Sequence, residues 1–395
     1  MSYQNPLNAI NFSGWREDPN VQLNIARVIE KASWSKSPFE SFFGKGADRG
    51  VRFYAVKDSQ PYRPRLKAPL TGAGVEGNAD LDTNYDSLEI MSQTTYPKVI
   101  ANAIKSEIEK YSALKQIDFV KEASDSLTDW MRLRRDKGLV SALITDFTNC
   151  VVCDATNNFK DTSAEPDVQT ASKKIVKGDV MNVQALRRAI FMARTGVNYK
   201  GKESYPLKPV KSELVSLQGI AIEHNSYIIL LDSYACNQLK NDPEWIEMQK
   251  SAGARGDENR LFTGLIGMID NCPVLDMGIW TPLQSGMPNS EVSDAEYMAN
   301  INPQNHKKLT PPSSYASNTQ PVSIGALIGA SALVMVGGER VDFYIDEADS
   351  GRKTIVGVDR LLAVSKARFD SNESGSLSPF HDTDFAVIGI FSSKE

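Results

Sequence analysis

Two strand patterns joined by a glycine-rich stretch most strongly constrain how this chain can fold. The patterns are "VRFYAVKDSQPYR" (51–63) and "DSLEIMSQTTYPKVIANA" (86–103), and "LTGAGVEGNADLD" (70–82) lies between them. Their β-favouring residues predict a long two-stranded ribbon over residues 52–100. Because such a ribbon is marginally stable alone in water and exposes unpaired edges, it must pack against another surface.

Gly72, Gly74 and Gly77 have the GxGxxG spacing of dinucleotide-binding loops. That motif binds a pyrophosphate only between an apolar strand and the N-terminus of a helix. Here residues 60–70 contain three prolines and three basic side chains, and residues 78–96 lack an apolar helical stripe. The favoured interpretation is a glycine-hinged extended arm without a cofactor, and a nucleotide-binding enzyme using the Gly72–Gly77 loop is the alternative.

Composition predicts a folded protein whose main role is not the tight binding of nucleic acid. The chain has 395 residues, 41% of them hydrophobic, and a formal net charge of -5. Affinity for phosphate backbones comes from clustered Lys and Arg, so nucleic acid is not expected to be the ligand, even where it lies nearby without specific recognition. The first 15 residues lack the basic and apolar regions of a secretory signal, which predicts that the chain stays in the cytoplasm where it is made.

Periodicity outlines the elements of a mixed α and β chain. The apolar run "SIGALIGASALVMVGG" (323–338) is too short to span a bilayer and predicts a buried small-residue helix, so no membrane association is expected. Further helices are expected over 19–34, over about 118–149, over 179–195 with Asp179 as the N-cap, and after 231; strands are expected over Tyr227–Leu231 and in the last 60 residues.

No motif for catalysis or metal binding is present in the sequence. Cys150 and Cys153 form a CxxC, but no second pair or suitably spaced histidines accompany it, so they are expected to be small apolar residues at a helix end. "DEADSG" (346–351) lacks the later glutamate of a calcium loop and predicts a hairpin turn. A decoration or tail adhesion protein that uses the charged loop at Arg255 is a second alternative.

Four segments, in order, resemble the major capsid proteins of tailed phages related to the podophage called N-four. They are "LTGAGVEGNADLDTNYDSLEI", "DFVKEASDSLTDWMRLRRDKGLVSALI", the stretch from "YIILLDSYACNQL" to "NRLFTGLIGMIDNCPVLDM", and "IGALIGASALVMVGG". The resemblance covers about residues 50–392. It implies a non-enzymatic protein that assembles into the icosahedral head of a tailed double-stranded DNA phage, made in the host bacterial cytoplasm and located in the virion capsid.

The resemblance also implies an α+β chain with the Hong Kong 97-type capsid fold. Its parts would be an N-terminal arm (1–52), an extended E-loop (53–100), a peripheral domain with a long spine helix (101–210), an axial domain with an insertion (211–320), and a return to the peripheral domain (321–395). Partners implied are the chain itself in hexamers and pentamers, with scaffold, portal and decoration proteins as further candidates. The loop 156–178 and the insertion 281–320 would be either elaborations within the family or docking surfaces for an accessory protein.

Assembly residues are expected on the ribbon and around its hinge. The three glycines would let one sequence bend differently at non-equivalent positions of a shell. Charged residues on either side are candidates for ion pairs between subunits, or for solvated surface charges. The candidate residues are Arg63, Arg65, Lys67, Gly72, Gly74, Gly77, Asp80, Asp82 and Asp86.

Overall fold

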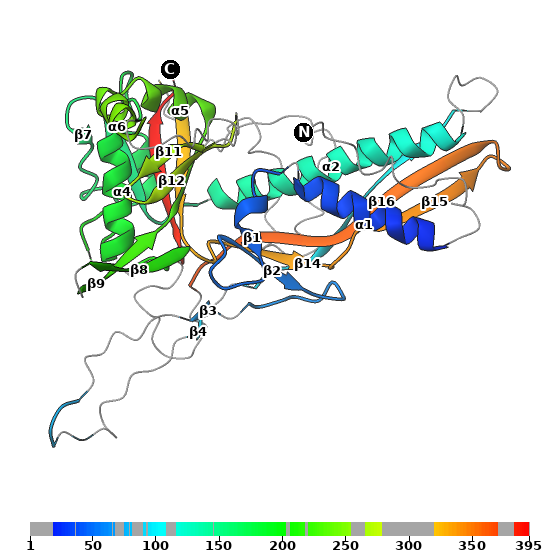
Figure 1. The fold of residues 1–395 in the computed structure, drawn as a ribbon, viewed down its shortest axis with the longest axis horizontal. Helices are drawn as coiled ribbons and strands as arrows, with labels where there is room; N and C mark the ends of the chain where they lie inside the picture. The colour runs from blue at the N-terminus through cyan, green and yellow to red at the C-terminus, as the bar shows by residue number, and fades with distance from the viewer. Residues whose placement is uncertain are drawn as a thin grey trace.

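The computed structural model shows an elongated molecule with two bodies of mixed α and β structure and a projecting arm (Figure 1). One body is built on a seven-stranded sheet and the other on a six-stranded sheet. The structure describes residues 19–35, 37–64, 66–67, 75–78, 80, 90–91, 94–107, 116–144, 146–202, 206–217, 220–253, 265–278, 320–369 and 383–394.

The seven-stranded sheet has the order β11-β12-β10-β13-β17-β6-β7 and combines segments that are far apart in the sequence. Helices α4 and α5 pack on it, α4 against β6, β7 and β17 and α5 against β10 and β13. The strands are β6 (Cys150–Asp154), β7 (Asn158–Phe159), β10 (Ile228–Leu231), β11 (Leu265–Ile269), β12 (Cys272–Asp276), β13 (Val322–Ile328) and β17 (Val387–Ser393), and the helices are α3 (Val168–Ser172), α4 (Val183–Thr195), α5 (Ser233–Lys240) and α6 (Pro243–Gly253).

The six-stranded sheet has the order β1-β2-β14-β16-β15, and β5 also pairs with β16. The long strand β16 spans the body, because its first half pairs with β15 and its last five residues pair with β14. The strands are β1 (Phe43–Gly44), β2 (Val51–Ala55), β5 (Lys98–Lys105), β14 (Leu333–Gly337), β15 (Asp342–Ala348) and β16 (Lys353–Lys366).

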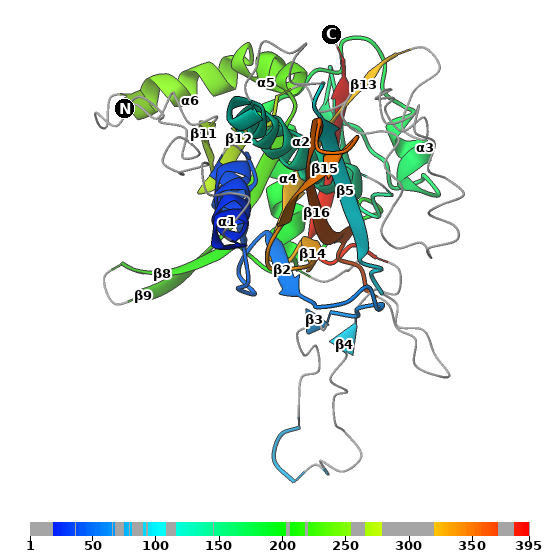
Figure 2. The same cartoon turned by 90° about the vertical axis from the view of Figure 1, so that its right-hand side faces the viewer.

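Two helices cover one face of the six-stranded sheet, as Figures 1 and 2 show. They are α1 (Pro19–Ser35) and α2 (Gln116–Ile144), and both were predicted from their apolar periodicity. Ile25 and Ile29 of α1 and Leu127 and Met131 of α2 are buried against Val356 and other sheet residues. The helix near the N-terminus therefore docks on its own chain.

The predicted continuous ribbon over residues 52–100 is wrong as a single two-stranded unit. Its first strand, β2, pairs in parallel with β14, and its last, β5, pairs antiparallel with β16, so both ends belong to the main sheet. Between them, Tyr62 and Thr95 form an isolated bridge, and β3 (Leu66–Lys67) pairs with β4 (Ile90–Met91). A larger sheet satisfies more backbone groups than a ribbon can, which explains the difference.

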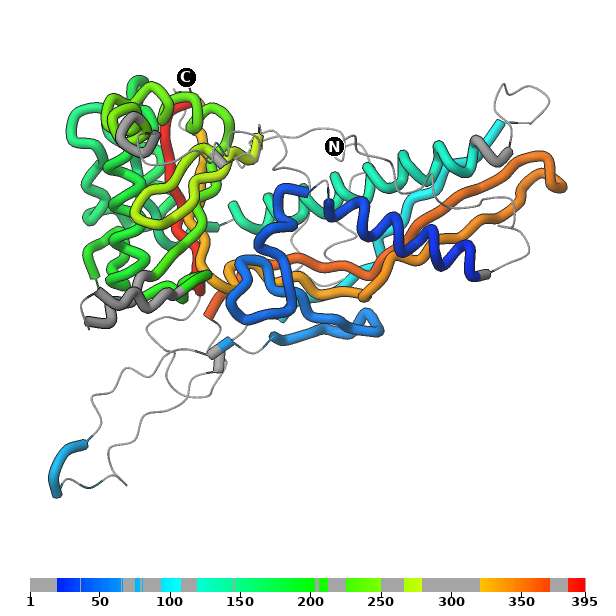
Figure 3. Tube along the Cα trace, in the orientation of Figure 1, coloured from blue at the N-terminus to red at the C-terminus, as the bar shows by residue number. Residues whose placement is uncertain are grey.

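The predicted small-residue helix at 323–338 is also wrong. This stretch forms β13 in one sheet and β14 in the other, so the chain crosses between the two bodies here (Figure 3). A Cβ on Gly325 would lie 2.5 Å from Leu231, and a Cβ on Gly329 would lie 2.4 Å from the Lys208 carbonyl oxygen. The small residues allow strands and loops to approach closely, rather than helices to pack.

Three smaller predictions can be compared with the structure. Helix α4 begins later than expected, because Asn182, not Asp179, accepts the N-cap hydrogen bond from the Ala185 backbone N–H. Cys150 and Cys153 are buried as expected, but they lie on strand β6 rather than at a helix end. The hairpin turn at 346–351 is confirmed between β15 and β16, with Gly351 at φ 82°.

Hairpin β8–β9 (Lys211–Leu217 and Ile220–Ser226) projects from the seven-stranded body as a separate two-stranded ladder (Figure 2). Its strands pair only with each other among the strands that the structure describes. The 156–178 stretch, expected to be a polar loop, contains β7 and the short helix α3.

Candidate functional site

The predicted assembly residues lie on the projecting arm, as far as the structure describes them. Arg63 is exposed beside the Tyr62–Thr95 bridge, and Lys67 pairs with Ile90 in the β3–β4 ladder. Gly77 has φ 67°, a left-handed conformation that favours glycine, and Asp80 is exposed. Arg65, Gly72, Gly74, Asp82 and Asp86 lie outside the described residues.

The base of the arm is fixed to the six-stranded body by buried contacts. Thr95 and Ser365 of β16 share a hydrogen bond of 2.8 Å between their buried hydroxyl oxygens. The Tyr54 and Tyr62 rings lie 5.4 Å apart, and the Arg52 guanidinium lies 4.8 Å from the Tyr54 ring centroid. Arg63, the residue after Tyr62, therefore lies beside a base that is fixed to this body.

A dinucleotide-binding loop does not fit the described part of the arm. The elements nearest the glycines, β3 and β4, are two residues each and pair with one another. In that part of the chain the described residues form no helix whose N-terminus could receive a pyrophosphate. The strand-and-helix context that the motif needs is therefore missing on the described residues.

Helices α1 and α2 are joined by a buried arginine that the sequence analysis did not identify. Arg135 has no exposed surface, and its guanidinium donates hydrogen bonds to the Ser33 carbonyl oxygen (2.8 Å) and to the Ser33 hydroxyl (3.1 Å). Burial lowers its pKa to about 10, and the Asp136 carboxylate opposes that effect. Leu127, Met131, Arg135 and Leu139 follow one another at four-residue spacing, so an arginine within an apolar stripe was the available signal.

A second charged pair ties α1 to strand β16. The Arg360 guanidinium donates to both Glu30 carboxylate oxygens at 2.8 Å, and its side chain is almost fully buried. The same Glu30 carboxylate accepts a hydrogen bond from the Trp34 indole at 2.8 Å. Glu30 therefore links one helix to the sheet that it covers.

A third buried cluster lies where the two bodies join. Lys366, at the end of β16, contacts the Asp384 carboxylate at 3.1 Å, and both side chains are almost completely buried. Asp384 also accepts from the Thr148 backbone N–H at 3.0 Å and lies 3.3 Å from the Arg368 guanidinium. Burial lowers the pKa of Lys366, and Asp384 opposes that effect. The cluster connects the segment after α2, the end of β16 and the segment before β17.

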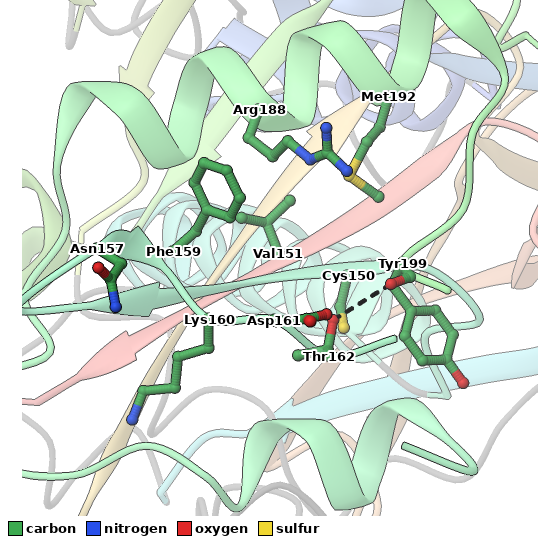
Figure 4. Close-up of a pocket in the computed structure, with 10 residues that line it drawn as sticks. All are labelled: Cys150, Val151, Asn157, Phe159, Lys160, Asp161, Thr162, Arg188, Met192 and Tyr199. Atoms are coloured by element: carbon green, nitrogen blue, oxygen red, sulfur yellow. Dashed lines mark hydrogen bonds between the residues drawn. The ribbon is translucent and has the colours of Figure 1, made fainter. Parts of the chain in front are cut away.

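A cavity of about 350 Å³ lies between β6, β7, α4 and the segment that follows β7 (Figure 4). Its charged groups do not form a catalytic set: Lys160 is paired with Asp179 at 2.6 Å, and Asp161 accepts from the Ser163 backbone N–H. Burial raises the pKa of Cys153 to about 12 and that of Cys150 further, so both thiols are protonated at neutral pH and are poor nucleophiles.

No three His, Cys, Asp or Glu side chains of the described residues come together as a metal-binding group. The described part of the chain contains no helix long and apolar enough to cross a membrane.

Comparisons with known proteins agree on one family. Residues 62–394 match the family model described as "Phage capsid protein". The chain is 44% identical, over 98% of its length and 99% of the relative's, to the "Major structural protein ORF14" of Helicobacter pylori bacteriophage KHP30. The acidic stable capsid structure of the same phage matches with a TM-score of 0.72 at 44% identity, covering 91% of this chain and 92% of that one.

The head structure of Helicobacter pylori bacteriophage KHP40 is similar as well. It matches with a TM-score of 0.69 at 44% identity and covers 98% of this chain and 99% of its own.

Proposed function

Since this chain belongs to the phage capsid protein family and is a major structural protein of a phage capsid, we propose that it self-assembles into the closed icosahedral head of a tailed double-stranded DNA phage. Copies of the chain would form hexamers and pentamers, and the genome would lie inside without sequence-specific contacts. The net charge of -5 supports this, because a shell should not hold its genome tightly. The proposed role involves no enzymatic turnover.

We assign the parts of the molecule to the Hong Kong 97-type plan. Helix α2 would be the spine helix of the peripheral domain, the seven-stranded body would contain the axial domain, and the arm through β3 and β4 would be the E-loop. The domain limits 1–52, 53–100, 101–210, 211–320 and 321–395 belong to this proposal, although β6, β7, α3 and α4 of the 101–210 range lie in the seven-stranded body. Scaffold, portal and decoration proteins are proposed partners, and assembly in the host bacterial cytoplasm is part of the same proposal.

One observation carries the proposal from this molecule itself. The arm leaves a base that is fixed by the Thr95–Ser365 hydrogen bond, and its strands β3 and β4 pair with each other below both bodies (Figures 1 and 2). A short ladder of this kind is too small to be stable alone, so it needs a second surface. A neighbouring copy of the chain provides one in a shell.

The experiment reverses the charge of the arm. We expect Arg63→Glu combined with Arg65→Glu to reduce the fraction of protein in large assemblies while the melting temperature of the unassembled chain stays unchanged. Lysine at both positions is the matched control and should assemble normally. Normal shells from the glutamate variant would refute the role of the arm, and a lowered melting temperature would show that the residues stabilise the monomer instead.

A further inference from the structure

Helix α4 carries three arginines, and only two of them have polar partners. The Arg187 guanidinium is paired with the Glu244 carboxylate of α6, and the Arg194 guanidinium donates to two backbone carbonyl oxygens. Arg188 forms no hydrogen bond and no ion pair within the part of the chain that the structure describes. Its N–H donors are therefore available to a group from outside this molecule.

Two aromatic rings position the Arg188 side chain. Its guanidinium carbon lies 5.5 Å from the ring centroid of Phe159 in β7 and 5.4 Å from that of Phe191, which is 50% exposed. A guanidinium beside aromatic rings keeps its N–H groups in a planar fork, and that fork matches the two oxygens of a carboxylate. The arrangement favours a carboxylate as the partner of Arg188.

Arg188 also lines the cavity between β6, β7 and α4, so this cation stands beside a hollow. Figure 4 shows Arg188 and Met192 reaching from α4 toward Val151 and Phe159 of the two strands. The volume of about 350 Å³ is at the small end of the range for ligand pockets. The cavity therefore combines apolar walls with one cationic group, and its size suits a side chain rather than a large ligand.

The other charged groups of the cavity lining are already balanced or exposed. The Lys160 ammonium lies 2.6 Å from the Asp179 carboxylate, and Asp161 is exposed and accepts a backbone hydrogen bond. The surrounding stretch is basic: residues 154–202 contain nine Lys and Arg against five Asp and Glu, whereas the whole chain has 44 against 49. Arg188 thus presents its charge within a surface that attracts an acidic partner.

We propose that this cavity binds a carboxylate that stands beside an apolar side chain, on a segment of a second protein that docks on the shell. The inference rests on the proposed function and gives its accessory partner a site and a chemistry. The carboxylate accepts two hydrogen bonds from Arg188, and the apolar side chain fills the hollow beside Val151 and Met192. A contact between folded copies buries about 1,600 Å² in total, whereas a small hollow beside one half-exposed ring suits a short segment.

The test measures the binding of short labelled peptides to the full chain by fluorescence anisotropy. The probes have blocked ends and carry glutamate next to leucine, phenylalanine or tryptophan, and each has a counterpart with glutamine in place of glutamate. We expect an acidic peptide to bind the wild type about tenfold or more tightly than its counterpart, because a charged hydrogen bond is lost with the glutamine. Arg188→Met should abolish this preference, and Arg188→Lys should weaken it, since lysine keeps the charge without the planar fork.

Arg187→Met is the matched control, because it removes the same charge from the next position of α4, where the guanidinium is paired with Glu244. It should keep the preference for the acidic peptides. Arg188→Met should melt at the wild-type temperature and assemble as the wild type does, because Arg188 has no polar partner to lose among the described residues.

Two results would overturn the site: a wild type that prefers none of the acidic peptides over their counterparts, or an equal loss of preference in Arg187→Met and Arg188→Met. Shells that form from the wild type and from Arg187→Met but not from Arg188→Met would show a contact between copies instead, and would also overturn it. If the wild type forms no shells in any condition, the proposed function fails, while the peptide measurements still decide whether the cavity recognises a carboxylate.

Discussion

Arg135 of α2 stacks on the indole ring of Trp34 of α1, with its guanidinium carbon 3.5 Å from the ring centroid. The arginine is completely buried, and its hydrogen bonds end on Ser33, next to Trp34 in α1. A short amphipathic helix has little stability alone in water. The contact therefore fixes the position of α1 by both charge and packing.

Arg135→Ala should lower the free energy of unfolding by about 3 kcal/mol, because it removes a buried cation and the packing of its stem. Arg135→Met should cost about half as much, since it keeps an unbranched apolar chain. Urea unfolding of the unassembled protein measures both losses. Leu133→Ala on the exposed side of the same helix is the control and should stay within about 0.5 kcal/mol of wild type. An Arg135→Ala variant as stable as that control would show that α1 is held by its apolar face alone.

The junction cluster should show strong coupling between Lys366 and Asp384. Asp384→Asn leaves the buried ammonium of Lys366 without its carboxylate and should cost about 3 kcal/mol of unfolding free energy. Adding Lys366→Met removes the unpaired charge, so the double variant should be more stable than Asp384→Asn alone. A double-mutant cycle in urea measures the coupling. Strictly additive losses would mean that the two side chains do not depend on each other.

Asp359 of β16 lies directly opposite Asp342 of β15 on the face away from the helices. Burial raises the pKa of Asp359, and the Asp342 carboxylate raises it further. The folded chain therefore binds this proton more tightly than the unfolded chain, so stability is lost as pH rises from the ordinary Asp pKa through the raised value.

Asp359→Asn should accordingly stabilise the protein at pH 7 by about 0.5 kcal/mol, because it removes a cross-strand repulsion. The gain should disappear as pH falls toward the ordinary Asp pKa of 3.8. Melting curves of both proteins from pH 7 to pH 3.5 measure the difference. Adding Asp342→Asn to Asp359→Asn should increase the stability at pH 7 only a little further. A difference that does not change with pH would contradict the assignment.

Replacement by alanine should change the stability of the chain in opposite directions at two glycines. A Cβ on Gly138, inside α2, would meet only Val364 at an ordinary contact distance of 3.8 Å, so Gly138→Ala should stabilise the chain by about 0.5–1 kcal/mol. A Cβ on Gly337 of β14 would lie 2.2 Å from the Leu361 carbonyl oxygen, so Gly337→Ala should destabilise it by about 2 kcal/mol. Thermal unfolding of both variants tests the pair, and destabilisation by Gly138→Ala would imply a closer approach at α2.

Elements with a regular apolar pattern were predictable from the sequence. Elements that depend on packing partners far along the chain were not. Helices α1 and α2 repeat their apolar residues every three to four positions, and β10 is a continuous apolar run. The stretch 323–338 has small residues at many positions. Only the contacts of Gly325 and Gly329 show that these residues let neighbouring strands and loops approach closely.

Buried charges were the least predictable part of the fold. Arg135, Arg360 and Lys366 each depend on a partner far along the chain, and their own sequence neighbours do not reveal it. Asp179 was predicted as a helix cap, but it accepts hydrogen bonds from the Ala155 and Val176 backbone N–H groups and pairs with Lys160. For the assembly site, the expected arm over residues 53–100 and its contacts, those at Arg65 and Asp82 included, stay predictions.

The most direct test of the capsid assignment is electron microscopy of the purified chain after size-exclusion chromatography, over a range of salt and protein concentrations. We expect closed shells, or sheets and tubes with a regular spacing between capsomers, in the fractions of high mass. A single small oligomer in every condition, with no lattice at any concentration, would contradict it.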